Sequence, residues 1–405
     1  MKRIIFVNRY FPPDHSATSQ LLGDLAFHLV QCGREVTVIT SRQRYDDPRA
    51  SLPATEILSG VHVHRVAATR FGRSRSFGRG FDYLSFWASV GRAVRAVSRP
   101  GDILVAKTDP PLLCVAAMRV ARQQGLHLVN WLQDLYPEVG ARLGVLLLGG
   151  PLGNGLTRLR DAALHAARAN VAVSDRMAQT VCGRGITVDR VHVIPNWCDD
   201  EAIQPLAARD NPLRREWGLE DRFVVGYSGN LGRAHEFETV LAAAEGLRHD
   251  HRIVFLFIGG GGRIEDLRRR ITERGLERQF RFVPYQQRDA LKYSLALPDL
   301  HWLSLLPKLE GLIFPSKLYG IAAAGRPFIA VTAADGEIAD LTRQYECGIV
   351  VEPGDALGLA EWLTRLSKDA ESLAAMGNRA RRMLDQNFTR DRALQRWRSV
   401  LDSIG

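Results

Sequence analysis

Short apolar runs alternate with segments of helical period along the first half of the chain. Seven runs predict strands, and helical segments such as 19–33 and 111–125 separate several of them. A parallel sheet with crossover helices requires this alternation. The runs are KRIIFVN, EVTVIT, VHVHRVA, DILVAK, LHLVNW, ANVAVS and VHVIPN.

The same alternation restarts in the second half. Further strands are predicted at FVVGYSGN, IVFLFIGG, FRFVPY, LHWLSL, PFIAVT and GIVVEP, and residues 197–220 between the halves are polar and carry prolines. We therefore expect an N-terminal domain over 1–197 and a C-terminal domain over 198–375. Residues 376–405 read as helical and can pack back across both.

Composition supports a two-domain protein. The chain has 405 residues, which is too long for one ordinary core, and 46% of them are hydrophobic, which supports well-buried sheets. No stretch approaches the roughly 18 to 20 unbroken apolar residues that cross a bilayer. The chain opens directly on a strand, so we expect no cleaved signal peptide and a cytoplasmic protein. Five scattered cysteines favour neither disulfides nor zinc.

The net charge of +10 is unevenly placed. Residues 1–100 carry 15 Lys plus Arg against 7 Asp plus Glu, a net +8. Within 68–95, arginines interleave with aromatic residues, a pattern typical of contact with an anionic membrane or a lipid-phosphate acceptor. A basic loop followed by an amphipathic core helix is the alternative; no nucleic-acid-binding motif accompanies the segment. The membrane candidates are Arg70, Arg73, Arg75, Phe77, Arg79, Phe81 and Trp87.

Two segments of the second half suit a diphosphate. In LEGLIFPSKLYGIAAAGRP, Ser316 can cap a helix and Lys317 adds a point charge at its start. In GYSGNLGRAHEFETVL, a glycine-rich turn follows a strand, lets the backbone approach a phosphate, and presents Asn230 and Arg233. An ordinary strand-to-helix turn is the alternative for the second segment.

Polar residues also follow two strands of the first half. Asp14, His15, Ser16 and Thr18 lie at a predicted helix start, where Asp14 or Ser16 can equally be a simple cap. WLQDLYPE places Asp134 and Glu138 at the end of a strand, where catalytic groups of such folds gather. Asp134 is the candidate for activating an acceptor hydroxyl, and a structural turn is its alternative.

Other chemistry is disfavoured by the motifs. No D-x-D triplet occurs, and the pairs Asp46-Asp47 and Asp199-Asp200 lie in polar loops without histidines, so we expect no metal. The run Gly259 to Gly262 is not a dinucleotide fingerprint, so we expect no cofactor.

In order and spacing, these pieces together resemble the retaining family 4 glycosyltransferases of GT-B fold, and most closely their exopolysaccharide and colanic-acid-type branch. The resemblance covers essentially the full length. It implies an α/β protein with two Rossmann-like, doubly wound domains facing across a cleft. A nucleotide sugar is expected mainly in the C-terminal domain and an acceptor in the N-terminal one.

The resemblance also implies donor contacts, with departures from the family pattern. Asn230 and His235 stand where many members carry Arg and Lys, and Leu312 and Gly320 occupy the two positions of the Glu-x7-Glu signature. Glu310 is then expected to reach the donor sugar and Glu337 the ribose, with Asp134 and Glu310 as the catalytic pair. The expected donor-binding residues are Gly229, Asn230, Arg233, Val283, Gly311, Leu312, Ser316, Lys317, Leu318 and Glu337; those for the acceptor are Asp14, His15, Ser16, Thr18 and Glu138.

The expected function is retaining transfer of a sugar from a nucleoside diphosphate to a polyprenyl-diphosphate-linked saccharide at the inner membrane face. The altered glutamates keep two alternatives open. One is a non-catalytic nucleotide-sugar-binding subunit of a polysaccharide assembly, and the other is a GT-B-type sugar-nucleotide epimerase.

Overall fold

The protein folds into two compact α/β units. The computed structural model describes residues 2–44, 51–69, 71 and 76–404. The first unit comprises Met1–Pro195, Gly311–Phe314 and Ala393–Gly405, and the second comprises Asn196–Glu310 and Pro315–Arg392. The chain thus returns to the first unit twice, once through a four-residue segment and once through its final helix.

The first unit is built on an eight-stranded sheet of order β3-β4-β2-β1-β5-β6-β7-β8. All pairs are parallel except β3 with β4. The strands are β1 (Ile4–Val7), β2 (Val36–Ser41), β3 (Thr55–Leu58), β4 (Val61–Val66), β5 (Ile103–Lys107), β6 (His127–Leu132), β7 (Ala169–Ala172) and β8 (Val191–Val193). The sequence pattern missed β3, a four-residue edge strand whose side chains are exposed or half-buried.

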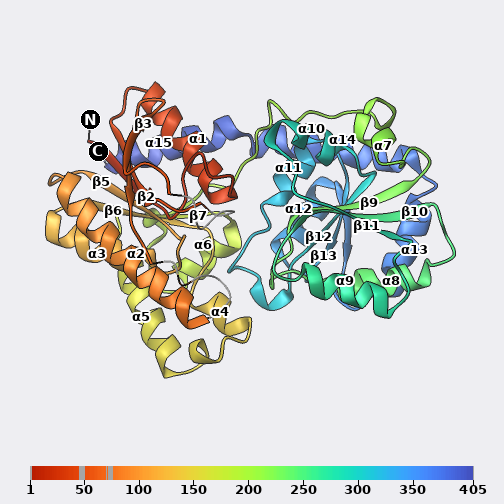
Figure 1. Ribbon diagram of the computed structural model, residues 1–405, viewed down its shortest axis with the longest axis horizontal. Coiled ribbons are helices and arrows are strands. Elements are labelled where there is room, and N and C mark those ends of the chain that lie inside the picture. Colours follow the sequence, from red (N-terminus) through yellow and green to blue (C-terminus); the bar gives the residue numbers. More distant parts are fainter. Residues whose placement is uncertain (1, 45–50, 70, 72–75, 405) are drawn as a thin grey trace. The chain divides into compact units, whose positions relative to one another are not determined.

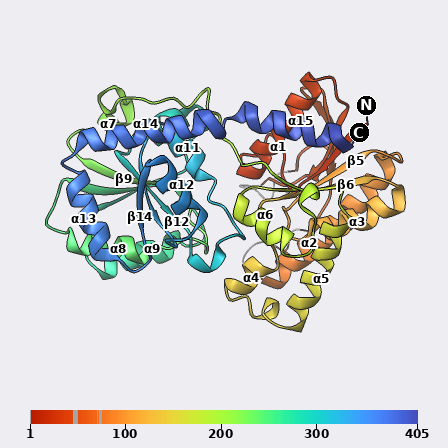
Figure 2. The ribbon, with the colours of Figure 1, turned by 180° about the vertical axis from the view of Figure 1, so that it is seen from behind.

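Helices cover both faces of this sheet (Figures 1 and 2). α2 packs on α3 and α3 on α5, and the three share one core with Ile5 and Val7 of β1. Side chains alternate along a strand, and Trp131 of β6 lies on the opposite face of the sheet from this core. There its ring meets the ring of Trp397 of α15. The helices are α1 (Ala17–Gln31), α2 (Ser76–Val97), α3 (Leu113–Gln124), α4 (Glu138–Arg142), η1 (Leu146–Leu148), α5 (Pro151–Ala166), α6 (Asp175–Cys182), η2 (Val188–Arg190) and α15 (Arg390–Ile404).

The second unit has a six-stranded, wholly parallel sheet of order β11-β10-β9-β12-β13-β14. Its strands are β9 (Phe223–Asn230), β10 (Ile253–Gly260), β11 (Phe280–Val283), β12 (Leu300–Ser304), β13 (Phe328–Val331) and β14 (Gly348–Val351). The central strands read as near-continuous apolar runs because helices bury both faces. Two Rossmann-like units are therefore confirmed.

Helices surround this second sheet, and a long one, α14, runs along it (Figure 2). They are η3 (Ala208–Asp210), α7 (Pro212–Glu216), α8 (Glu238–Gly246), α9 (Ile264–Glu273), η4 (Arg288–Ala290), α10 (Leu291–Ala296), η5 (Pro307–Leu309), α11 (Lys317–Ala323), α12 (Glu337–Tyr345), α13 (Ala356–Leu366) and α14 (Ala370–Asn387). Asp355 and Asp369 cap α13 and α14, because the side chain of each accepts the backbone N–H of the third residue of its helix.

Each sheet has one place where the strand order reverses. In the first unit it lies between β1 and β5, and in the second between β9 and β12. Ligands of open parallel sheets bind beyond the carboxyl ends of the strands at such a switch point. The loops after β1, β5, β9 and β12 are therefore where function is to be sought.

Candidate functional site

The donor candidates of the second unit gather at the carboxyl edge of its sheet. β9 ends at Asn230, and the loop after it carries Arg233 and His235. The loop after the neighbouring β12 carries Glu310 and leads to Lys317, and the loop after β13 leads to Glu337. Residues far apart in the sequence thus share one edge because their strands are adjacent.

Glycines let the loops after β9 and β10 approach closely. Gly229, Gly259 and Gly261 have φ values of 120°, 135° and 133°, which favour glycine. A Cβ on Gly261 would lie 2.5 Å from the backbone nitrogen of Leu231, which itself donates to the Gly260 carbonyl. Glycine at 259 and 261 therefore lets the loop after β10 pack directly on the backbone of the loop after β9.

Lys317 is the least expected group at this edge. Its Nζ is buried, makes no hydrogen bond to any described residue, and sits 3.5 Å from the centroid of the Tyr227 ring. Burial lowers its pKa well below the ordinary lysine value. The sequence did not single out Tyr227, although an aromatic residue inside the glycine-rich GYSGN was a usable signal.

His235 joins the same cluster. Its ring meets the Tyr227 ring edge-on at 5.9 Å between centroids, and its Nδ1 lies 2.8 Å from the Ser304 carbonyl oxygen. Burial and the Lys317 charge lower its pKa to about 3, with the carbonyl contact opposing them. The imidazole is therefore neutral at physiological pH. Because a carbonyl only accepts, Nδ1 carries the proton and Nε2 is an acceptor.

Glu310 and Glu337 are brought together by a backbone contact. Glu310 Oε1 accepts the N–H of Glu337 at 2.7 Å, at the start of α12. A carboxylate there stabilises the helix by itself. A Cβ on Gly336 would lie 2.8 Å from Glu310 Oε2, so a larger residue there would displace this carboxylate.

The remaining donor candidates occupy varied environments. Ser316 stands at the N-cap of α11 but accepts no hydrogen bond there, because its backbone is already helical; the predicted cap was wrong. Leu318 is fully buried in the core, Val283 ends β11 half-buried, and Arg233 is exposed. Helix α11 has only seven residues, so the charge of Lys317 matters more than a helix dipole.

Gly311 and Leu312 lie in the first unit. The Leu312 carbonyl accepts the N–H of Leu135 at 2.9 Å, and Asp134 pairs with Ile313 in an isolated antiparallel bridge. A Cβ on Gly311, whose φ is 71°, would lie 2.8 Å from Thr180 Oγ1. Their predicted contact with the donor stays a prediction.

Asp134 has an altered acidity. Burial first, and the charge of Asp109 second, raise its pKa to about 6. Asp109 follows β5 and Asp134 follows β6, so the two carboxyl groups lie on neighbouring loops at the carboxyl edge. The sequence analysis missed Asp109, whose place at the switch point appears only from the strand order.

The loop after β1 supports the same edge. Asp14 is buried and its Oδ1 accepts the N–H of Ser16 at 2.8 Å, which closes the turn before α1. The Ser16 side chain accepts no N–H of α1 and so does not cap the helix. The His15 side chain is exposed. Thr18 Oγ1 donates to Asp109 Oδ2 at 3.5 Å, a long contact, and the Thr18 carbonyl accepts from the buried Lys107 Nζ at 3.1 Å.

Glu138 is engaged in ion pairs. Its Oε1 accepts from the Arg160 guanidinium, which is buried, and from Arg184 at 2.9 Å. This contact ties α4 to α5 and α6. The expected role of Glu138 in holding an acceptor stays a prediction.

The basic-aromatic segment is described only in part. Arg70, Arg73 and Arg75 lie outside the described residues, as do the side chains of Phe77 and Arg79 and the acidic pair at 46–47. Phe81 is 62% exposed. Trp87 instead packs partly buried against the core, so the core-helix interpretation holds for this residue.

The described ranges contain neither a membrane-spanning helix nor a cluster of metal ligands. No helix there has the length and apolarity to cross a membrane. No three His, Cys, Asp or Glu side chains within those ranges gather as metal ligands.

Comparisons with known proteins agree with the fold. Residues 18–197 match the glycosyl transferase 4-like domain family and residues 210–383 match the glycosyl transferases group 1 family. The putative colanic acid biosynthesis glycosyl transferase WcaI of Escherichia coli K12 is 31% identical over 60% of this chain and 61% of its own length. The probable glycosyltransferase WbjE of Pseudomonas aeruginosa is 25% identical over 98% of this chain and 97% of its own.

Solved structures show the same fold. HepE from Anabaena in complex with UDP-glucose superposes with a TM-score of 0.74 at 16% identity, covering both chains fully. Sucrose-phosphate synthase from Thermosynechococcus elongatus gives 0.80 at 16% identity, covering 100% of this chain and 99% of its own. With both domain families matched in order along the chain, it belongs to the family 4 glycosyltransferases of GT-B fold.

Proposed function

We propose that the protein transfers a sugar, with retention of configuration, from a nucleoside diphosphate to a lipid-linked saccharide. The observation that carries the donor side is the buried Nζ of Lys317, which makes no hydrogen bond to a described residue. A buried cation without a counter-charge is costly unless a ligand supplies one. The leaving diphosphate is the anion that this family's chemistry provides.

Lys317 and His235 divide the work on the donor. Negative charge develops on the diphosphate as the glycosidic bond breaks, and a preorganised cation in a dry site stabilises it. Because His235 is neutral, it does not compete with Lys317 for the diphosphate. Its Nε2 can accept a hydrogen bond from a hydroxyl group of the donor sugar. Arg233 and Asn230, from the same loop, are further candidates for the diphosphate. Glu337 is the candidate for the ribose and Glu310 for the sugar.

The acceptor is proposed to bind the first unit at Asp134. Retention by attack on the same face as the departing diphosphate requires no strong enzymic base. An ionised Asp134 accepts a hydrogen bond from the acceptor hydroxyl and orients it. The raised pKa puts the change of charge of this carboxyl near physiological pH.

Similar proteins use sugar nucleotides with more than one base. A GDP-mannose-dependent alpha-mannosyltransferase of Mycolicibacterium smegmatis is 29% identical over 61% of this chain, and HepE has been solved with UDP-glucose. These names support a nucleotide-sugar donor without selecting its base. The colanic acid relative supports an acceptor on the route to a surface polysaccharide.

We further propose that the protein works as a peripheral protein at the inner face of the membrane, where such an acceptor resides. The support is the net +8 of residues 1–100 and the arginines and aromatic residues between Arg70 and Trp87.

A transfer assay tests the proposal. The purified protein is incubated with a panel of nucleoside diphosphate sugars and polyprenyl-diphosphate-linked saccharides, and the product is separated and its anomeric configuration read by NMR. We expect a lipid-linked product whose new linkage keeps the donor configuration. An epimerised donor, an inverted linkage, or binding without turnover across the panel would each refute the corresponding part.

A further inference from the structure

A helical hairpin of the first unit exposes leucines at its tip. The turn joining α4 to α5 contains η1, where Leu146 is 93% and Leu147 63% exposed. Leu152 on α5 is 56% exposed. We call this set the leucine tip; its members are Val145, Leu146, Leu147, Leu152 and Leu159.

The exposure is built into the hairpin. Leu148 is half-buried and packs closely on α4 and α5, since a Cβ on Gly140 would lie 2.4 Å from its Cδ1 and a Cβ on Gly153 would lie 2.0 Å from its carbonyl oxygen. The Val145 N–H bonds to the Gly140 carbonyl at 2.9 Å, and the buried Arg160 pairs with Glu138 at the hairpin base. These contacts hold the turn in place, so the leucines are exposed on an ordered turn.

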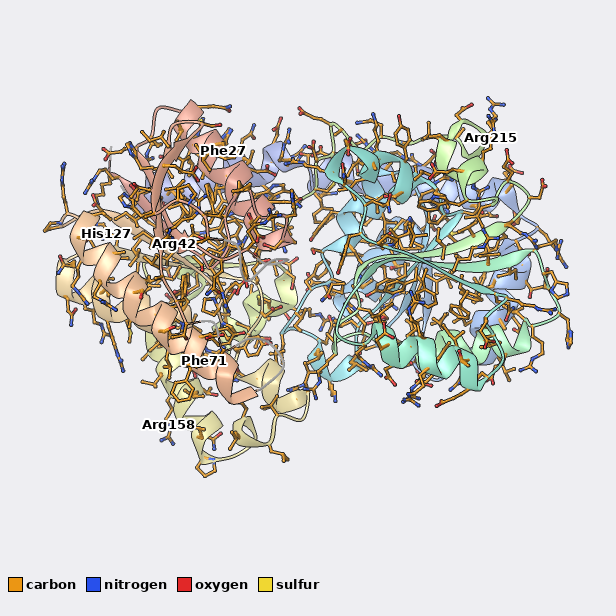
Figure 3. All side chains as sticks on the ribbon, viewed as in Figure 1. Phe27, Arg42, Phe71, His127, Arg158 and Arg215 are labelled. Atoms are coloured by element: carbon orange, nitrogen blue, oxygen red, sulfur yellow. The ribbon has the colours of Figure 1, made fainter. Side chains whose placement is uncertain are left out.

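A second apolar element lies at the same end of the unit. Phe71 and Phe81, before and within α2, are 64% and 62% exposed, with their rings 6.2 Å apart, and Leu84 is 57% exposed. Asp82 fixes this arrangement by accepting the Phe71 N–H at 3.0 Å. Figure 3 places Phe71 and Arg158 of α5 at the same end, and Figures 1 and 2 show the start of α2 beside α4 and α5.

The sequence of these two segments carries arginines and no acidic residue. Between Glu138 and Asp161 the chain carries Arg142, Arg158 and Arg160, the last of which pairs with both of these carboxylates. From 66 to 81 it carries four arginines and again no acidic residue. Protruding apolar side chains on segments whose sequence carries arginines and no acidic residue suit an anionic bilayer, where acyl chains receive the leucines and headgroups the arginines.

We infer that the leucine tip inserts into an anionic lipid surface beside the start of α2, as a second and mainly apolar anchor. A protein groove would not require the arginines of these segments, so the charge pattern favours an anionic lipid surface as the occupant. This inference rests on the proposed membrane location of the acceptor. Salt screens the attraction between the arginines and anionic lipid, but it does not screen the apolar contact of the leucine tip.

Vesicle flotation of the full chain tests it, with vesicles of phosphatidylcholine and phosphatidylglycerol at low and high salt. The double variant L146S/L147S should bind at least about tenfold more weakly, because two exposed leucines lose their transfer into acyl chains. The matched control is L357S, which changes an 81% exposed leucine on α13 of the second unit and should float as wild type. Raising salt should weaken wild type while leaving a residual binding that L146S/L147S lacks.

Other outcomes decide against the inference. Equal flotation of L146S/L147S and wild type would overturn it. So would light scattering that shows a dimer of the wild type alone, since the tip would then contact a second copy. Nucleotide-sugar binding, measured on the same samples, verifies folding. Transfer assayed in detergent with the lipid-linked acceptor separates the two ideas: loss of flotation without loss of transfer concerns the tip, and absence of transfer in wild type concerns the proposed function.

Discussion

At the scale of single residues, burial sets the chemistry. Lys317, His235 and Asp134 each sit where water is scarce, and each pKa moves toward the neutral form. Lys107 behaves likewise: buried, its Nζ lies 3.7 Å from the centroid of the Trp131 ring and its pKa is well below the ordinary value. Its hydrogen bond to the Thr18 carbonyl gives it a structural role, which distinguishes it from Lys317.

Asp134 yields a prediction about pH. Its pKa is about 6 in the folded protein against an ordinary 3.8, so between these values the unfolded chain is ionised while the native carboxyl keeps its proton. The unfolded state binds fewer protons there, so this residue makes the free energy of unfolding fall as pH rises, by at most about 1.4 kcal/mol per pH unit. Asp134→Asn should remove that slope, which urea unfolding at pH 4 to 7 measures.

The same variant should also change catalysis. In the wild type, transfer should rise through about pH 6 as Asp134 ionises. In Asp134→Asn turnover should be lower without that rise, while donor affinity stays close to wild type. A variant with the wild-type turnover and pH profile would show that Asp134 does not orient the acceptor.

At the scale of elements, the donor edge depends on two glycine turns packed against each other. Gly261 combines a φ of 133° with a Cβ position 2.5 Å from backbone of the neighbouring loop, whereas Gly262 has no atom within 4 Å of its Cβ position. The pair therefore allows a matched comparison.

Gly261→Ala should destabilise the second unit by about 1 to 3 kcal/mol and weaken nucleotide binding, because the backbone must shift where a ligand would approach. Gly262→Ala should leave both nearly unchanged. Thermal unfolding and titration of a nucleoside diphosphate measure the two effects. Equal behaviour of the two variants would contradict the tight packing of these turns.

Most elements could be predicted from the sequence, because parallel strands buried on both faces are continuous apolar runs. The strand β3 was missed because TEIL is a short edge strand without buried positions, although Ser59 and Gly60, both with positive φ, form the short turn that joins it to β4. The site was harder. Lys317 could be named from its motif, but its isolation depends on Tyr227, which a distant strand supplies.

At the scale of the whole molecule, the last helix of the sequence, α15, packs in the first unit. Its Trp397 is fully buried 4.6 Å from Trp131, measured between ring centroids. Arg34 of the same unit pairs with Asp402 at 2.5 Å. The first unit is therefore completed by a helix that follows the second unit in the sequence.

Trp397→Ala should destabilise the first unit by about 3 to 5 kcal/mol, because a large buried side chain leaves a cavity. The second unit should keep its nucleotide binding. Urea unfolding followed by limited proteolysis assigns the loss to a unit. If unfolding were unchanged, or if nucleotide binding were lost first, the assignment of α15 would be wrong.

The central claim is that the second unit binds a nucleoside diphosphate through Lys317, and calorimetric titration tests it most directly. UDP, GDP and ADP are titrated into wild type and Lys317→Ala, with Lys308→Ala, on the loop that leads to α11, as the control. We predict that wild type and control bind at least one of the three alike. Lys317→Ala should bind it about tenfold to hundredfold more weakly, since one charge-assisted contact contributes about 1.5 to 3 kcal/mol. Identical isotherms for wild type and Lys317→Ala would contradict the account.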